Sequence, residues 1–205
     1  MKKTIILIIS IFMFIGGTVN AQHDFDINAA GLFYKNFGVD YEYNIKDQMG
    51  IGLSFTYAQN TLGMALDDGV NFSTIDIVGE HKFYPNPSNG GDRFYISLYI
   101  KYRTSSWKDM SYTSANLEKK YDMSFQGMAV GFQTGYKKVF PSGIYFEGSI
   151  GAGRYLFTKW DDTADPSHNL SDKNNDYKNN EFVDHFMFNW DVRFALSLGW
   201  RFGKF

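Results

Sequence analysis

The sequence contains no cysteine, only 4 prolines and, beyond its first 21 residues, no long apolar run. Without cysteine, we expect neither a disulfide framework nor the lipid-bearing cysteine of a lipoprotein anchor. Without a later window of about 18 consecutive apolar residues, we expect no helical membrane span. The net charge of -2 gives no reason to expect nucleic acid as a partner.

The N-terminus has the layout of a cleavable secretory signal. Two lysines precede an apolar run, residues 5–15, that is too short to cross a bilayer as a helix. The sequence VNA before Gln22 then offers the small residues that a signal peptidase reads. We therefore expect residues 1–21 to be a signal peptide and residues 22–205 to form one exported domain.

The chain is rich in aromatic residues, which make up 19% of its length, and it contains 20 glycines. In the final segment every even position is apolar, and the odd positions between them are mostly small, polar or charged. A period of two predicts a strand and excludes a helix. The apolar positions are Phe186, Phe188, Trp190, Val192, Phe194, Leu196, Leu198, Trp200 and Phe202.

Seven further segments repeat this period, so the sequence predicts eight strands in an antiparallel meander. The connections alternate in length, with the long ones expected at residues 58–71, 104–122 and 158–185. Short turns at one rim and long loops at the other are typical of an outer-membrane barrel. The seven earlier strands are expected at residues 25–33, 37–45, 49–57, 74–83, 93–103, 127–137 and 143–153.

Alternation alone also fits a lipocalin-type barrel, in which the apolar side faces inward. Volume distinguishes the two, because an eight-stranded barrel has an interior that side chains only just fill. The last strand alone offers six large aromatic side chains on its apolar face, and these do not fit inside. The opposite face is dominated by glycine, serine, alanine and threonine, which suits a narrow lumen. We therefore expect the apolar face to meet lipid.

The polar face also carries charges of both signs. In a narrow interior these should pair, because an unpaired buried charge costs several kcal/mol. We expect a plug of ion pairs in the lumen and not an open pore. The acidic members are Asp40, Glu42, Asp76, Glu80, Glu147 and Asp191, and the basic members are Lys82, Arg93, Lys101, Arg103, Lys137, Arg193 and Arg201.

Aromatic residues gather near both ends of the expected strands, as in interfacial girdles. With its early strand VDYEY and its terminal GWRF, the mature chain resembles small eight-stranded outer-membrane barrels of the OmpA and OmpX type and uncharacterised exported β-barrel proteins. The resemblance implies a monomer in the outer membrane, surrounded by lipid and inserted by the barrel-assembly machinery. It also implies a terminal aromatic assembly signal, for which Phe202 and Phe205 are both candidates.

The acidic segment 158–185 is the candidate for an external functional loop. Asp172, Asn174 and Asp176 occupy the first ligand positions of a calcium loop, but Tyr177 stands where glycine is required and Val183 where a bidentate glutamate belongs. We interpret the segment as a solvated loop and assign no metal and no cofactor, with a weak divalent-ion site as the alternative.

The same segment also contains residue types suited to hydrolase chemistry. Ser167, His168, Asp184 and His185 are the residue types that lipid A-modifying barrels use near their outer rim. Nothing in the sequence brings them together, so we predict no enzyme and no catalytic residue.

Two residues fall on the lipid-facing parity although they are not apolar. His81 is expected at headgroup level near the turns. Arg154 is expected outside as well, unless a bulge at residues 151–153 turns it inward. Neither is assigned a function.

The sequence therefore predicts a non-enzymatic scaffold that presents external loops for envelope integrity, adhesion or interaction. The expected loops hold aromatic residues among many polar ones, a mixture suited to contacting proteins or glycans. A small diffusion channel is the first alternative, and a lipid A-modifying outer-membrane hydrolase is the second. The aromatic residues concerned are Trp107, Tyr112, Tyr121, Trp160 and Tyr177.

Overall fold

The computed structural model describes residues 22–33, 35–59, 71–114, 117–163 and 189–203. This part of the chain holds eight strands and one short helix, and none of its helices is long and apolar enough to cross a membrane. The elements are β1 (Gln22–Asn28), α2 (Ala29–Leu32), β2 (Asn36–Lys46), β3 (Met49–Gln59), β4 (Asn71–Phe83), β5 (Arg93–Ser114), β6 (Leu117–Val139), β7 (Ile144–Asp162) and β8 (Trp190–Phe202).

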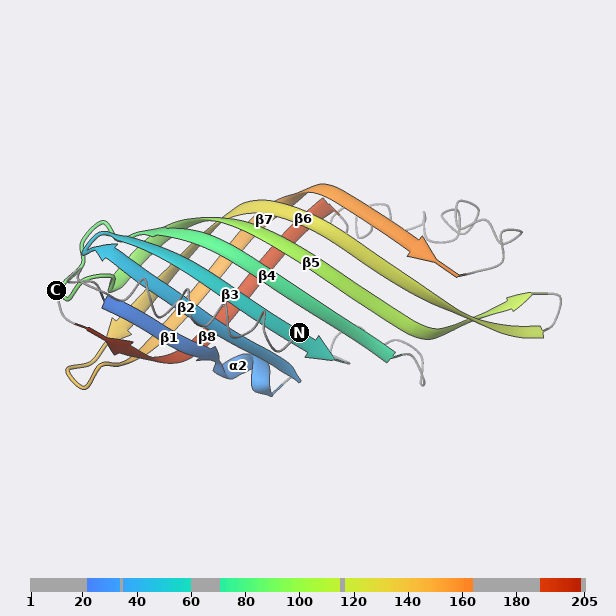
Figure 1. Cartoon of the computed structure of the whole chain (residues 1–205), viewed down its shortest axis with the longest axis horizontal. Helices are drawn as coiled ribbons and strands as arrows, with labels where there is room; N and C mark the ends of the chain where they lie inside the picture. Colours follow the sequence, from blue (N-terminus) through green and yellow to red (C-terminus); the bar gives the residue numbers. More distant parts are fainter. Residues whose placement is uncertain (1–21, 34, 60–70, 115–116, 164–188, 204–205) are drawn as a thin grey trace, which may run out of the picture.

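The eight strands form a closed barrel in which each strand pairs with its sequence neighbours and β1 pairs with β8. All pairings are antiparallel, from Gln22↔Asn44 between β1 and β2 to Arg154↔Trp190 between β7 and β8. Figure 1 shows the barrel on its side, with the β2–β3, β4–β5 and β6–β7 turns at the end where β8 finishes. We name this the turn end and the opposite one the loop end. The predicted meander of eight strands is confirmed.

The first strand is shorter than predicted. It ends at Asn28, and the residues expected to extend it to Phe33 form the helical turn α2. The cause is local: the Asn28 side chain accepts a hydrogen bond from the Gly31 amide at 2.9 Å, as an N-cap residue does. The alanines that follow have high helix propensity, which outweighs the apparent alternation.

The predicted loop at residues 104–122 is wrong. Strands β5 and β6 run on to Ser114 and from Leu117, so this segment is a long hairpin that projects beyond the other strands (Figure 1). A register shift follows Trp107, where Asp109 has a φ of 61°, and pairing then resumes. The segment is polar, but its threonine, tyrosine and tryptophan residues still favour a strand.

The two other predicted long loops are also shorter at their edges. β3 extends to Gln59, β4 begins at Asn71, and β7 extends to Asp162. These strand ends continue past the residues that carry the hydrophobic alternation. Backbone pairing with a neighbouring strand therefore continues beyond the residues in which apolar and polar side chains alternate.

The two faces of the sheet have the predicted orientation. On β8, Phe194 is 67% exposed, whereas Asp191 and Arg201 are 1% and 8% exposed and point into the lumen. Of the charged residues predicted inside, Arg93 is the one that is exposed. It is the first residue of β5, at the turn end, and its φ of 71° lies in the left-handed region, so it departs from the regular strand geometry on which the prediction rests.

Candidate functional site: the ion-paired lumen

Near the turn end of the lumen, Lys137 lies at the centre of a cluster of carboxylates. Its ammonium group contacts Asp24 Oδ2 at 2.9 Å, Glu42 Oε2 at 2.5 Å and Glu147 Oε2 at 3.3 Å. Lys137 stands on β6, while these partners stand on β1, β2 and β7. The contacts to β1 and β2 therefore run across the barrel between strands that do not pair.

A second buried lysine shares two of these carboxylates. Lys82 Nζ lies 3.1 Å from Glu42 Oε2, 2.7 Å from Glu147 Oε1 and 3.4 Å from Glu80 Oε1. Tyr95 donates a hydrogen bond to Glu147 Oε1 at 2.5 Å. The predicted pairing of lumen charges is confirmed near the turn end. Because both lysines contact Glu42 and Glu147, these charges form one network.

The network continues to Arg201 on β8. Its guanidinium donates to both oxygens of Asp24, from Nε at 2.6 Å and from Nη2 at 2.7 Å. The same group donates to the carbonyl oxygens of Asn89 and Gly91, each at 2.8 Å, and to that of Gly90. One arginine thus ties the β4–β5 turn to the barrel wall.

That turn closes the turn end of the barrel. Gly91 donates its amide to the Asp47 carbonyl at 2.8 Å, and the Tyr84 amide donates to the Gln48 carbonyl at 2.9 Å. The Tyr84 side chain is fully buried and donates to Glu42 Oε1 at 2.7 Å. Burial raises the pKa of the Tyr84 phenol, which keeps it a neutral donor.

A third group of charges lies toward the loop end. Arg103 donates to both oxygens of Asp76, each at 2.7 Å, and Lys101 pairs with Asp191. Tyr99 donates to Asp191 Oδ2 at 2.8 Å. These are the bidentate and charge-assisted contacts that give buried pairs their strength.

An aromatic cluster lies beyond the charges at the base of the long hairpin. It consists of Phe72, Trp107, Phe125, Tyr155 and Trp160. The Phe125 and Trp160 rings are 4.6 Å apart between centroids, and the Trp107 and Trp160 rings stack at 5.9 Å. This packing stiffens the hairpin where it leaves the barrel.

Four of the aromatic residues that we expected on loops lie on strands instead, namely Trp107, Tyr112, Tyr121 and Trp160, and the fifth, Tyr177, lies outside the described residues. Trp107 and Tyr121 are 9% and 8% exposed, so they are not available as contact surface, whereas Trp160 is 39% exposed. For the residues before 123 the error follows from the predicted loop 104–122, and for Trp160 it follows from the predicted loop 158–185, because β5, β6 and β7 all extend further than predicted.

Several further residues of the lumen were not among the predicted inner charges. Asp24 anchors the turn-end cluster, and Asp26 accepts a hydrogen bond from Tyr145 at 2.7 Å. Tyr95 and Tyr99 are hydroxyl donors to lumen carboxylates. The signal that could have found them is parity, since all of them share the face of the charged residues.

The candidates for metal binding and hydrolysis lie outside the described residues. Among the described residues, no group of three or more histidine or acidic side chains could hold a metal ion. These candidates are Ser167, His168, Asp172, Asn174, Asp176, Tyr177, Val183, Asp184 and His185.

The two non-apolar residues that we expected on the outer face lie on that face. His81 and Arg154 are exposed. The β-bulge considered at residues 151–153 lies further along, at Leu156, where the β6–β7 register shifts. Arg154 therefore keeps its outward direction.

The closed ring, the apolar exterior and the ion-paired interior define an up-and-down β-barrel with the polarity of the transmembrane class. No protein-family model matches the sequence, and neither does any curated protein. Among solved structures, CarO from Acinetobacter baumannii is similar over 89% of this chain and 96% of its own, with 10% identity and a TM-score of 0.49. A major outer membrane protein from Thermus thermophilus is similar over 89% and 98%, with 16% identity and a TM-score of 0.49. The barrel architecture follows from the strand pairing of the chain itself.

Proposed function

We propose that the protein is an integral outer-membrane barrel with a closed lumen, which acts as a non-enzymatic scaffold for interactions at its loop end. The observation that carries the proposal is the opposite polarity of the two sheet faces. Ile150 and Phe194 are 59% and 67% exposed, whereas Asp24 and Lys137 are fully buried. An exterior of this kind far exceeds the contiguous apolar surface that soluble monomers carry, and it suits lipid.

The filled lumen favours a scaffold over a diffusion channel. The ion pairs of Lys137 cross the barrel from β6 to β1 and β2, and the Arg201 clamp holds the β4–β5 turn across the turn end. Opening a path would require breaking these buried charge pairs, each of which is costly to separate. A steady aqueous route is therefore not expected.

The scaffold role rests on the long hairpin of β5 and β6. It projects beyond the remaining strands, and the aromatic cluster packs against its base (Figure 1). Recognition surfaces commonly stand on rigid frames of this type. We propose an extracellular protein or glycan as the partner, with export by the signal peptide at residues 1–21, insertion by the barrel-assembly machinery, and a monomeric state.

The test replaces hairpin residues 109–122 with a short Gly-Ser turn. The matched control makes the same kind of replacement at residues 141 and 142, in the turn at the other end. Both variants should insert into lipid vesicles, and only the hairpin variant should fail to rescue the phenotype of a host lacking the protein. Full rescue by the hairpin variant would contradict the proposed surface, and stable unitary conductance of the intact barrel in planar bilayers would establish a channel instead.

A further inference from the structure

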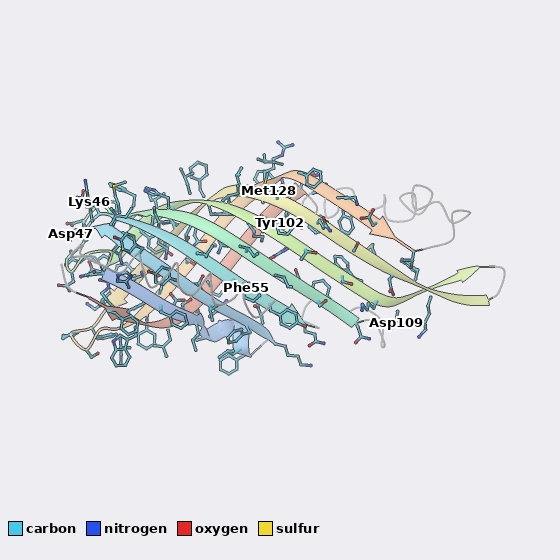
Figure 2. All side chains as sticks on the ribbon, viewed as in Figure 1. Lys46, Asp47, Phe55, Tyr102, Asp109 and Met128 are labelled. Atoms are coloured by element: carbon cyan, nitrogen blue, oxygen red, sulfur yellow. The ribbon has the colours of Figure 1, made fainter. Side chains whose placement is uncertain are left out.

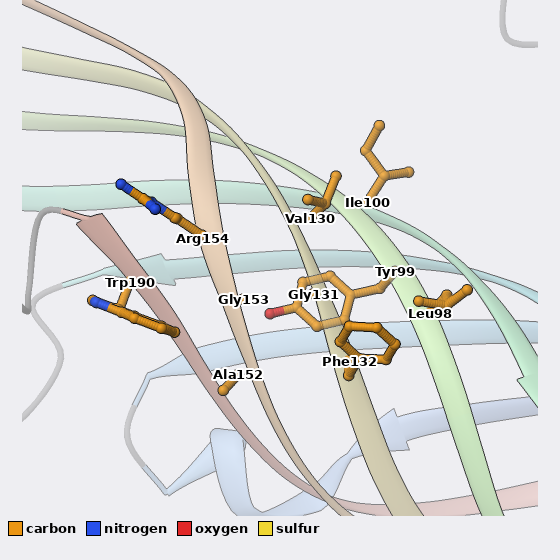
Figure 3. Close-up of a pocket in the computed structure, with 10 residues that line it drawn as sticks. All are labelled: Leu98, Tyr99, Ile100, Val130, Gly131, Phe132, Ala152, Gly153, Arg154 and Trp190. Carbon is orange, nitrogen blue, oxygen red and sulfur yellow. The ribbon is translucent and has the colours of Figure 1, made fainter.

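The outer face of the barrel, whose side chains are drawn in Figure 2, carries a hollow of about 640 Å³ that spans β5, β6, β7 and β8. Its lining is almost entirely apolar. Figure 3 shows Leu98 and Phe132 at one end of the hollow, with Arg154 and Trp190 at the other. The small side chain of Ala152, which pairs with Phe132 in the register, leaves the space between them open.

The floor of the hollow is fixed by two inward-facing glycines. Gly131 and Gly153 are register partners on β6 and β7. A Cβ atom at Gly131 would lie 2.6 Å from Tyr99 Cζ, and one at Gly153 would lie 2.5 Å from Tyr99 Oη. Tyr99 is itself held by its hydrogen bond to Asp191, so the wall behind the hollow has a defined shape.

Arg154 is a cation on a surface that otherwise meets hydrocarbon. It is exposed, and no described carboxylate lies within ion-pairing distance of it. A lipid-facing arginine is costly unless an anion neutralises it or it reaches the headgroup layer. No described residue supplies this anion, so the lipid around the barrel is the source that we consider.

The position of Arg154 along the strand indicates which part of the bilayer supplies that anion. It comes 10 residues after Ile144, the first residue of β7 at the turn end. A tilted strand crosses the hydrocarbon core in about 9–11 residues. Its register partner Trp190 is the kind of residue that marks the interface. Arg154 thus lies at the boundary of the leaflet on the loop side.

We propose that this hollow is a lipid-binding site, in which an acyl chain of a phosphorylated glycolipid occupies the apolar groove and its phosphate pairs with Arg154. The inference rests on the outer-membrane location proposed above, because that location makes the loop-side leaflet the one built from such glycolipids. Phosphate suits arginine through bidentate, charge-assisted hydrogen bonds. Arg154 lines the groove, so one lipid molecule can fill the groove with an acyl chain and pair its phosphate with the arginine.

The test measures retention of purified diphosphoryl lipid A by the refolded barrel in neutral detergent, with native mass spectrometry as the readout. Two variants probe the two halves of the site: Arg154→Gln removes the charge, and Ala152→Trp fills the groove while the charge stays. The control is Lys138→Gln, which removes an exposed cation near the turn end of β6, outside the hollow.

Arg154→Gln should weaken lipid A binding about tenfold, the usual effect of losing one charge-assisted contact. Ala152→Trp should weaken it by a similar factor, and Lys138→Gln should bind as the unaltered protein does. Dephosphorylated lipid A should bind the unaltered protein and Arg154→Gln equally. Binding of Arg154→Gln within about twofold of the unaltered protein would overturn the site, and so would equally tight retention of phosphatidylglycerol.

Failure of the proposed membrane location would look different. In that case the unaltered chain would not insert into vesicles and would not show the heat-modifiable mobility of a folded barrel. If the unaltered chain inserts into vesicles and all variants bind lipid A equally well, the membrane location is supported and the proposed lipid site is contradicted.

Discussion

Lys137 and Asp24 are 113 positions apart in the sequence, yet Lys137 Nζ lies 2.9 Å from Asp24 Oδ2 and both side chains are fully buried. Because β6 and β1 do not pair, this contact crosses the lumen. Glu42 and Glu147 contact the same ammonium group. The lysine therefore shares in neutralising three acidic residues on three strands, together with Lys82 and Arg201.

Replacing this lysine tests how far the barrel depends on its ion pairs. Lys137→Met should lower the free energy of unfolding by about 3–5 kcal/mol, because it removes a buried positive charge from three carboxylates and leaves only Lys82 and Arg201 to compensate them. The measurement is urea unfolding in lipid vesicles, followed by tryptophan fluorescence. The control is Lys159→Met, which breaks an exposed pair with Asp161 and should cost about 1 kcal/mol or less. Equal effects would contradict the account.

The hydroxyl of Tyr99 should contribute to the stability of the barrel through its hydrogen bond to Asp191. Tyr99→Phe keeps the ring that lies 4.8 Å from the Arg193 guanidinium but removes the donor to Asp191. A hydrogen bond to a buried charged group contributes about 1.5–3 kcal/mol, so the variant should be less stable by that amount. Tyr102→Phe, on the outer face of the same strand, is the control and should leave the unfolding midpoint unchanged.

Closure of the turn end should depend on Arg201. Arg201→Ala removes the hydrogen bonds to the carbonyls of the β4–β5 turn. The Gly91 and Tyr84 amides should then exchange with deuterium at least about tenfold faster, because their protection needs the turn to stay docked. Exchange mass spectrometry of the folded barrel measures this, with Lys138→Ala as a control that leaves the turn intact. Unchanged exchange would show that the turn holds its place without the arginine.

Two glycines should respond differently to the same substitution. Gly91 has a φ of 49°, and an added Cβ would lie 2.7 Å from Asn44 Cγ, so Gly91→Ala should destabilise by about 1–3 kcal/mol. At Gly79 the nearest atom would be Ile100 Cγ2 at 3.6 Å, an ordinary contact, so Gly79→Ala should be neutral or slightly stabilising. Comparison of the two unfolding midpoints checks this, and a destabilised Gly79→Ala would count against the geometry.

The alternation of apolar and polar residues was sufficient to predict the barrel, its eight strands and the direction of its faces. It gave wrong predictions where a capping interaction or an unusual backbone conformation determines the local structure. Asn28 caps a helical turn where the alternation predicts a strand, and Arg93 adopts a left-handed backbone that the alternation does not reveal. The hairpin beyond Trp107 was not predicted because its sequence is mostly polar and lacks the alternation, whereas the backbone pairing continues.

The partners of the lumen charges were only partly predictable. Parity places Lys137, Glu42 and Asp24 on the inner face, but which of them meet depends on the stagger of the barrel, which no single strand encodes. The outer hollow was not predicted at all. It arises from the sizes of Ala152 and Phe132 on neighbouring strands, and thus from a register that only the folded sheet defines.

The most direct test of the central claim uses single cysteines at positions 193 and 194, since the chain has no cysteine of its own. Each variant is labelled with a fluorophore, refolded into vesicles and exposed to a quencher dissolved in the hydrocarbon core. The label at 194 should be strongly quenched and the label at 193 should not, because Phe194 faces outward and Arg193 faces the lumen. Quenching at 193 and protection at 194 would contradict the account.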